Sequence, residues 1–250
     1  MARRGGPPDY IGLGARGAPV AWWHGLLLRH PAIRGATRLR RELRFFTEFC
    51  EREMIDADVV RYHGRFRRGA GEIAGEWSSG YFHQPWTPVL LRRAAPDAKL
   101  LLLLTDPFAQ YRARVDEGRR QLGAEEAHHY AVDGITRARY GTQLRALREV
   151  VEPERILVLQ HEQCVRDPLG EYRRTLRFLG VDEDVVPARV REARPPVRRW
   201  RGMLRRRRVE PVVLWPEIER TLHDELDPEV EALQAMVPEL RLELWPAFAR

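Results

Sequence analysis

The stretch DYIGLGARGAPVA, residues 9–21, predicts a short buried strand, a glycine loop and the start of a helix. A loop of this kind offers backbone N–H groups to a phosphate, usually together with a cation and one or two hydroxyls. Here the span from Tyr10 to Ala36 contains no Ser, Thr or Lys, and Pro19 removes one N–H donor. The stretch therefore predicts the shape of an anion-binding loop without the side chains that usually hold the anion.

The composition is typical of a globular protein. The chain has 250 residues, of which 44% are hydrophobic and 32% charged. Its formal net charge is +7, and almost all of the positive charge is arginine because Lys99 is the only lysine. No stretch approaches the roughly 20 apolar residues that span a bilayer, and the N-terminus lacks an apolar signal core. We therefore expect a cytoplasmic protein with no membrane partner.

Strands alternate with helices through short turns, which predicts an α/β fold with a parallel β-sheet flanked by helices. We expect strands at 9–13, 43–46, 99–104 and 156–160, helices at 19–29, 48–60, 86–95, 108–117, 135–151, 168–179, 215–225 and 227–236, and a loop at 66–80. The chain is expected to form a single domain, residues 1–250. In this domain, residues 9–182 would form the core, and residues 187–250 would supply a basic lid loop, near 189–210, and a helical C-terminal extension.

Seven segments, in their order and spacing, resemble the sulfotransferase family that uses 3′-phosphoadenosine-5′-phosphosulfate (PAPS), whose fold is similar to that of P-loop kinases. They are Asp9–Pro31, Arg41–Phe46, Gly75–Tyr81, Pro96–Pro107, Arg137–Leu144, Ile156–Pro168 and Phe178–Gly180. The second is similar to the family's Lys-Glu-x-x-Phe-Phe element, and the third to its Gly-Glu-Lys-Ser-Pro-x-Tyr element. The resemblance covers residues 9–182 and implies the sulfotransferase fold.

The chain departs from the family mainly where the cofactor is held. The resemblance places an altered cofactor site at Arg16, Gly17, Ala18, Pro19, Val20, Ala21, Thr105 and Ala113. The family's lysine, glycine and hydroxyl pair fall on Gly17, Pro19 and Val20-Ala21. Its 3′-phosphate arginine and serine fall on Thr105 and Ala113. The loss of four or five bonds to charged groups would cost about 6–12 kcal/mol of binding.

One chemical group of the family is kept. In glycan-modifying sulfotransferases, the glutamate of Lys-Glu-x-x-Phe-Phe is the base for the acceptor, and it corresponds to Glu42. The aromatic residues Phe45, Phe46 and Trp77 are expected to shield this carboxylate from water, which suits proton transfer. The alternative is a surface charge paired with Arg40 or Arg41.

Two histidines and a group of aromatic and serine residues complete the predicted site. His30, after the first helix, and His83, after the Gly75–Tyr81 segment, are candidate catalytic partners of Glu42, although His30 could instead cap its helix. Trp77 replaces the family's active-site lysine with a flat apolar surface, which indicates an apolar substrate. The predicted substrate pocket consists of Trp22, Trp77, Ser78, Tyr81, Phe45 and Phe46.

Other sequence features do not indicate a second kind of ligand. The four arginines 205–208 have no interleaved aromatic residues, so we expect a solvated basic lid and no nucleic-acid partner. Cys50 and Cys164 lie far apart and are expected to be buried, with no disulfide. No His or Cys cluster has metal-ligand spacing, so no metal site is expected.

Three functions remain open. The first is an enzyme of sulfotransferase fold that has lost PAPS and needs no cofactor. It would carry out acid/base chemistry, such as cyclisation, elimination or isomerisation, on a small apolar, specialised-metabolite substrate. The second is a PAPS-dependent sulfotransferase that modifies a small-molecule hydroxyl or amine through an arginine-based site. The third is a non-catalytic binding protein. The sequence does not indicate an oligomeric state.

Overall fold

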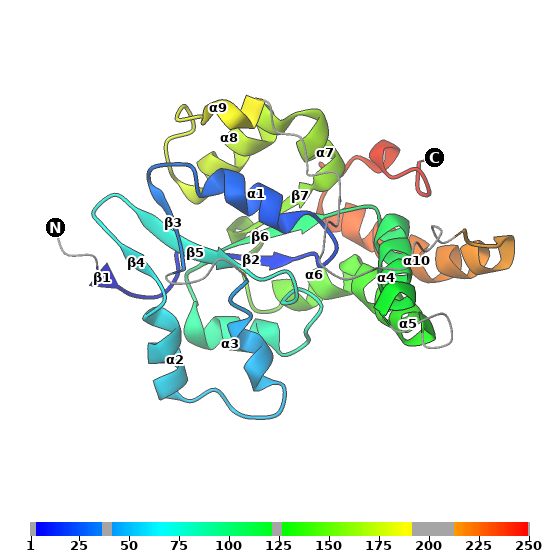
Figure 1. Ribbon diagram of the computed structural model, residues 1–250, viewed down its shortest axis with the longest axis horizontal. Coiled ribbons are helices and arrows are strands. Elements are labelled where there is room, and N and C mark those ends of the chain that lie inside the picture. The colour runs from blue at the N-terminus through cyan, green and yellow to red at the C-terminus, as the bar shows by residue number, and fades with distance from the viewer. Residues whose placement is uncertain (1–3, 37–41, 122–126, 192–212, 250) are drawn as a thin grey trace. The chain divides into compact units, whose positions relative to one another are not determined.

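The computed structural model describes residues 4–36, 42–121, 127–191 and 213–249 (Figure 1). The chain divides into two compact units. The first comprises residues 1–104 and 146–195, and the second comprises residues 105–145 and 196–250. The single domain expected from the sequence, with its core at residues 9–182 and its extension at 187–250, stays a prediction. The structure groups residues 105–145 with the C-terminal helix because these segments pack on each other.

The first unit is built on a five-stranded parallel sheet, as the alternation of strands and helices predicts. Its strands are β2 (Tyr10–Gly14), β3 (Ile33–Gly35), β5 (Ile73–Trp77), β6 (Lys99–Leu104) and β7 (Ile156–Gln160), in the order β3-β5-β2-β6-β7. A separate antiparallel pair joins β1 (Arg4–Gly5) to β4 (Arg67–Arg68). The remaining elements of this unit are α1 (Val20–Leu27), η1 (Phe45–Phe49), α2 (Asp56–His63), α3 (Thr87–Ala94), η2 (Pro153–Arg155), α7 (His161–Arg166), α8 (Pro168–Leu179) and α9 (Ala188–Arg191).

Helices cover both faces of this sheet (Figure 1). On one face, α1, α7, α8 and α9 pack on alternate strand residues, among them Tyr10, Leu101 and Leu159. The other face carries α2 and α3 together with a cluster of aromatic rings from η1 and α2. In that cluster, the ring centroids of Phe46 and Tyr62 are 5.0 Å apart. Leu100–Leu104 is buried throughout, as expected for a central strand covered on both faces.

Strands β2 and β5 pair through glycines that lie under aromatic rings. In the register of this pair, Tyr10 lies opposite Gly75, and Gly12 lies opposite Trp77. A Cβ atom on Gly12 would come within 2.1 Å of the Trp77 ring, and one on Gly75 within 2.6 Å of the Tyr10 ring. Each strand thus has a glycine, without a side chain, at the position that the aromatic ring of the other strand covers.

The second unit is helical. It contains α4 (Pro107–Gln121), α5 (Ala127–Ala138), most of α6 (Tyr140–Arg148), α10 (Pro216–Met236) and η3 (Leu242–Leu244). Asp106 caps α4, because its carboxylate accepts hydrogen bonds from the N–H groups of Phe108 (2.7 Å) and Ala109 (3.1 Å). Arg112 of α4 forms an ion pair with Glu219 of α10 at 2.8 Å.

Several predicted elements differ from the observed ones. Residues 43–46 were expected to form a strand, but the 3₁₀ helix η1 begins at Phe45, and α2 begins only at Asp56. The strand β5 lies inside the predicted loop 66–80. The helix predicted at 135–151 is divided between α5 and α6. Conversely, the two predicted C-terminal helices are one helix, α10, which continues through Pro228 because its buried residues, Leu222, Leu226, Val230 and Leu233, keep a helical spacing.

The contact between Gly12 and Trp77 predicts opposite effects for two Gly→Ala substitutions. Gly12→Ala should lower the free energy of unfolding by about 1–3 kcal/mol, because the new methyl group collides with the indole. Gly25→Ala in α1 is the matched control. Nothing lies within 4 Å of its Cβ position, so alanine should stabilise the helix by about 1 kcal/mol. Urea unfolding curves of the two variants test this, and equal effects would contradict it.

Candidate active site around Glu42

The loop between β2 and α1 uses much of its own hydrogen-bonding capacity. The Ala15 N–H donates to the Leu103 carbonyl at 2.7 Å, the Ala18 N–H to the Ala15 carbonyl at 3.1 Å, and the Val20 N–H to the Ala18 carbonyl at 2.8 Å. Pro19 occupies the N-cap position of α1 and makes no side-chain cap bond. The N–H groups that an anion would bind at this helix start are therefore largely paired with protein carbonyls.

The side chains of this loop do not compensate. Arg16 is the only arginine or lysine between Tyr10 and Leu28, and it is half-buried. Gly17, Ala18, Val20 and Ala21 supply neither a charge nor a hydroxyl. The side chains of this loop therefore offer an anion one charge, that of Arg16, and no hydroxyl. In the second unit, Ala113 of α4 likewise supplies no hydroxyl, and Thr105 is half-buried just before Asp106.

Trp77 packs in the apolar core beneath the loop. Its side chain is 3% exposed, and its Nε1–H donates to the Gly14 carbonyl at 3.2 Å. The ring of His24 in α1 lies 6.0 Å from it, and burial lowers the pKa of His24 to about 4. At neutral pH both groups are therefore uncharged. Trp77 was predicted to line a substrate pocket, but its observed contacts are those of a core residue.

Glu42 lies in the segment that precedes η1. Its Oε1 accepts a hydrogen bond from the Ser79 hydroxyl at 2.6 Å, and its Oε2 accepts one from the Arg44 Nε at 3.0 Å. The side chain is 24% exposed, so solvent or a small molecule can reach the carboxylate. These bonds are polar, and the shielding of Glu42 by Phe45, Phe46 and Trp77 stays a prediction. Arg40 and Arg41, its alternative partners, lie outside the described residues.

A second carboxylate, Glu76 of β5, was not singled out in the sequence. It is 2% exposed, and its Oε1 accepts hydrogen bonds from the hydroxyls of Tyr62 (2.8 Å) and Tyr81 (3.2 Å). Its Oε2 accepts one from the Ser78 hydroxyl at 2.6 Å. Burial raises the pKa of Glu76 from 4.5 to about 7, although the three hydroxyl donors act in the opposite direction. The negative charge of Glu42 adds to the rise.

The structure brings together only part of the predicted site. Glu42, Ser78 and Ser79 lie close together through the bonds described here and the 2.9 Å bond from the Arg44 N–H to the Ser78 hydroxyl. The other predicted pocket residues, apart from the half-buried Trp22, are buried and pack on neighbouring rings. The ring of Phe45 packs against that of Tyr62, Phe46 against Tyr81, and Trp22 against Trp23, each pair with its rings tilted.

The two predicted histidines have different surroundings. His30 is 2% exposed, and its Nδ1 accepts a hydrogen bond from the Ala32 N–H at 3.1 Å. Its Nε2 therefore carries the proton and donates it to the Asp182 carbonyl at 3.0 Å. Both nitrogens of His30 thus connect backbone segments, which is a structural role. His83 is half-buried two residues after Tyr81 and stays a prediction.

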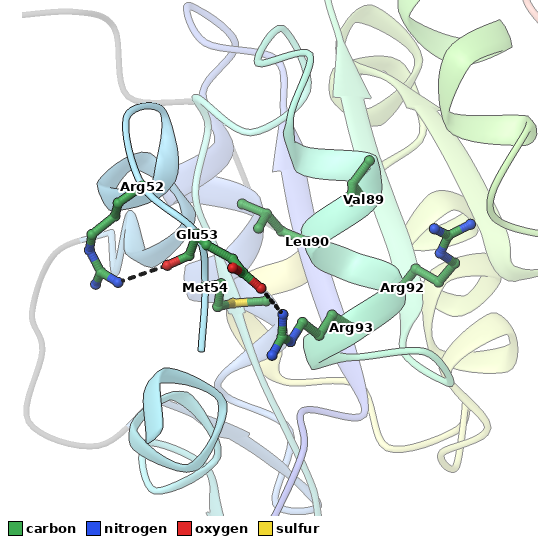
Figure 2. Close-up of a pocket in the computed structure, with 7 residues that line it drawn as sticks. All are labelled: Arg52, Glu53, Met54, Val89, Leu90, Arg92 and Arg93. Carbon is green, nitrogen blue, oxygen red and sulfur yellow. Dashed lines mark hydrogen bonds and ion pairs between the residues drawn. The ribbon is translucent and has the colours of Figure 1, made fainter. Parts of the chain in front are cut away.

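A surface pocket of about 450 Å³ lies beside α3 (Figure 2). It is lined by Arg52, Glu53, Met54, Val89, Leu90, Arg92 and Arg93. The Arg93 guanidinium donates to the Glu53 carboxylate at 3.1 Å across this pocket. None of the residues predicted for the site lines it, so it is a separate feature of the surface.

Several further expectations concern metals, cysteines and the basic lid. Among the described residues, no three His, Cys, Asp or Glu side chains are placed to hold a metal ion, and no helix is long and apolar enough to cross a membrane. Cys164 is buried as expected, whereas Cys50 is exposed because it follows η1 at the surface. Most of the predicted lid, including the four arginines 205–208, lies outside the described residues.

The burial of Glu76 predicts a pH dependence of stability. Because the pKa of Glu76 is raised in the folded protein, the folded state binds a proton that the unfolded state has lost between pH 4.5 and about 7. The contribution of Glu76 to the free energy of unfolding is thus fully present below pH 4.5. It falls by about 3 kcal/mol as the pH rises to about 7. Glu76→Gln should remove this part of the pH dependence in unfolding curves measured from pH 4.5 to 8. The exposed control Glu51→Gln should retain it, and identical slopes in both variants would contradict the assignment.

Comparisons with known proteins agree with this fold. The model of a family described as the sulfotransferase family matches residues 81–184. The crystal structure of a sulfotransferase from Alicyclobacillus acidocaldarius superposes with a TM-score of 0.68 and is 22% identical, covering 95% of this chain and 98% of its own. No curated protein matches the chain.

Two biosynthetic domains show a weaker likeness. The sulfotransferase domain of the curacin biosynthetic pathway has a TM-score of 0.49 and 16% identity, with 70% of this chain and 75% of that domain covered. The sulfotransferase domain of the Synechococcus PCC 7002 olefin synthase has a TM-score of 0.49 and 15% identity, with 96% of this chain and 97% of that domain covered. The chain thus has the fold of the sulfotransferase from Alicyclobacillus acidocaldarius, and its residues 81–184 match the model of the sulfotransferase family.

Proposed function

We propose that this chain is an enzyme of sulfotransferase fold that does not use PAPS and transfers a proton through Glu42 on a small apolar, specialised-metabolite substrate. The observation that carries the proposal is the contrast between two parts of the same unit. In the β2–α1 loop, the N–H groups of Ala15, Ala18 and Val20 donate hydrogen bonds to protein carbonyls. Glu42, by comparison, has ordered donors and an accessible carboxylate.

The contacts of Glu42 suit a general base. Ser79 and Arg44 each donate to one carboxylate oxygen, which fixes the plane of the carboxylate and leaves lone pairs free for a substrate proton. A base held in this way can remove a proton from one atom and return it to another, which produces an isomerisation, an elimination or a cyclisation. Proton transfer of this kind contributes about 10²–10⁴-fold to a rate.

Transfer of a sulfonate from PAPS is the second candidate function. The fold and the family match over residues 81–184 favour it, because that family uses PAPS. Glu42 would then remove the proton of an acceptor hydroxyl or amine, and Arg16 would be the one loop cation available to the donor. A non-catalytic binding protein is the third candidate, and Glu42 would then be dispensable.

Calorimetry with 3′-phosphoadenosine 5′-phosphate separates the first two functions. We expect no saturable binding in the micromolar range, because the N–H groups of Ala15, Ala18 and Val20 are paired with protein carbonyls and the loop has no hydroxyl side chain. A sulfotransferase that uses PAPS, titrated under the same conditions, is the positive control. Micromolar binding that is lost in Arg16→Ala would overturn the proposal in favour of the sulfonate transfer.

Glu42→Gln tests whether the carboxylate is catalytic. A metabolite extract is incubated with the protein, with and without PAPS, and products are followed by mass spectrometry. We expect a product without added PAPS, of equal mass or with loss of water, whose formation falls at least about 100-fold in Glu42→Gln. The exposed control Glu51→Gln should be as active as the wild type. A mass gain of one sulfonate group that requires PAPS, or a product that Glu42→Gln still forms, would contradict the proposal.

A further inference from the structure

We propose that Glu76 is a positioning residue for Glu42, because its buried carboxylate holds the backbone of residues 44–46 through two hydroxyl relays. Glu76 itself is too deeply buried to meet a substrate. The inference rests on the proposed function only in taking Glu42 as the group that is positioned.

The first relay passes through Ser78. Its hydroxyl donates to Glu76 Oε2 at 2.6 Å and accepts the Arg44 N–H at 2.9 Å. A serine hydroxyl has a single proton, so its donation to Glu76 leaves its lone pairs directed at the backbone of Arg44. The carboxylate thus sets the direction in which Ser78 accepts.

The second relay passes through Tyr81. Its hydroxyl donates to Glu76 Oε1 at 3.2 Å and accepts the Phe46 N–H at 3.2 Å. Tyr62 of α2 donates to the same oxygen at 2.8 Å. One carboxylate therefore orders two hydroxyls that hold the N–H groups at the start of η1, just after Glu42.

The backbone at Arg44 needs such support. Its φ angle is +49°, a left-handed conformation that is rare for residues other than glycine and costs about 1 kcal/mol or more. The Nε–H of the same arginine donates a hydrogen bond to Glu42 Oε2. Release of the Arg44 N–H would allow this backbone to relax, and the guanidinium would then move away from Glu42. Ser79, the next residue after Ser78, holds the other oxygen of Glu42.

The charge state of Glu76 controls both relays. The titratable groups that face it are Tyr62 of α2, Tyr81 and Glu42. Tyr10 of β2 lies on the other face of the sheet and interacts with Glu76 only through the charge of that carboxylate. All three hydroxyls bonded to Glu76 act as donors, which matches an ionised carboxylate. A protonated carboxyl adds a donor of its own, so one hydroxyl must turn and its relay weakens. Because burial raises the pKa of Glu76 to about 7, this change falls near neutral pH.

Amide hydrogen exchange tests the relays one at a time. At pH 8 we expect Ser78→Ala to lower the protection of the Arg44 amide at least tenfold and to spare the Phe46 amide. Tyr81→Phe should have the reverse effect, and Glu76→Gln should lower both. The amides of residues 100–104 report on global unfolding, and Glu51→Gln is the control. Wild-type protection at Arg44 and Phe46 in Glu76→Gln would overturn the inference. Protection lost equally at both amides in each single-relay variant would also overturn it.

Kinetics then separate positioning from packing. In the assay of the proposed function, Glu76→Gln should lower kcat with little change in KM, and it should remove the wild-type fall in kcat as the pH drops through about 7. A raised KM with the wild-type pH profile would show that Glu76 acts on packing alone and would overturn the inference. If Glu42→Gln retains activity while the exchange results hold, the proposed function fails and the backbone role of Glu76 stands.

Discussion

The Trp77 ring lies over Gly12, and this contact determines what each face of β5 carries. Because residues alternate along a strand, the burial of Trp77 against α1 directs Glu76 to the opposite face, under Tyr62. Truncation of a buried aromatic ring costs about 3–5 kcal/mol. The raised pKa of Glu76 corresponds to a penalty of about 3 kcal/mol. The packing of Trp77 can therefore offset the cost of the buried carboxylate. The next residues along the chain, Ser78 and Ser79, connect β5 to the segment of Glu42, because Ser79 donates to the Glu42 carboxylate.

The elements with a strong local signal agree with the sequence analysis. The strands β2, β6 and β7 and the helix α8 lie within a residue of their predicted bounds, because each has a continuous apolar run or a clear cap. Strand β5 was missed because Gly75 and Glu76 are unusual in a buried strand. Both have a tertiary reason, since Gly75 lies under the Tyr10 ring and Glu76 meets three hydroxyls. No local pattern contains that information.

The candidate site was predictable only in part. The resemblance identified Glu42, but its bond to Ser79 joins residues 37 positions apart. Glu76 lies in the Gly75–Tyr81 segment, but its alternation with Trp77 indicates only that the two side chains are on opposite faces of a strand, not that the carboxylate is buried. Phe45 and Phe46 were expected at a pocket because they follow Glu42. The helical turn of η1 directs them into the aromatic cluster instead.

The core position of Trp77 also determines how the structure would respond to the lysine that the resemblance expects there. The side chain of a lysine at this position would start opposite Gly12, between the sheet and α1. The neighbouring His24 is neutral there because burial lowers its pKa to about 4. An ammonium there would lose its hydration, and the carboxylate of the adjacent residue, Glu76, could not pair with it because it lies on the other face of the sheet. Replacement of the indole would also leave a cavity over Gly12 and remove the bond to the Gly14 carbonyl at the start of the loop. Trp77 thus links the loop to the strand pair, and Trp77→Lys would disturb both.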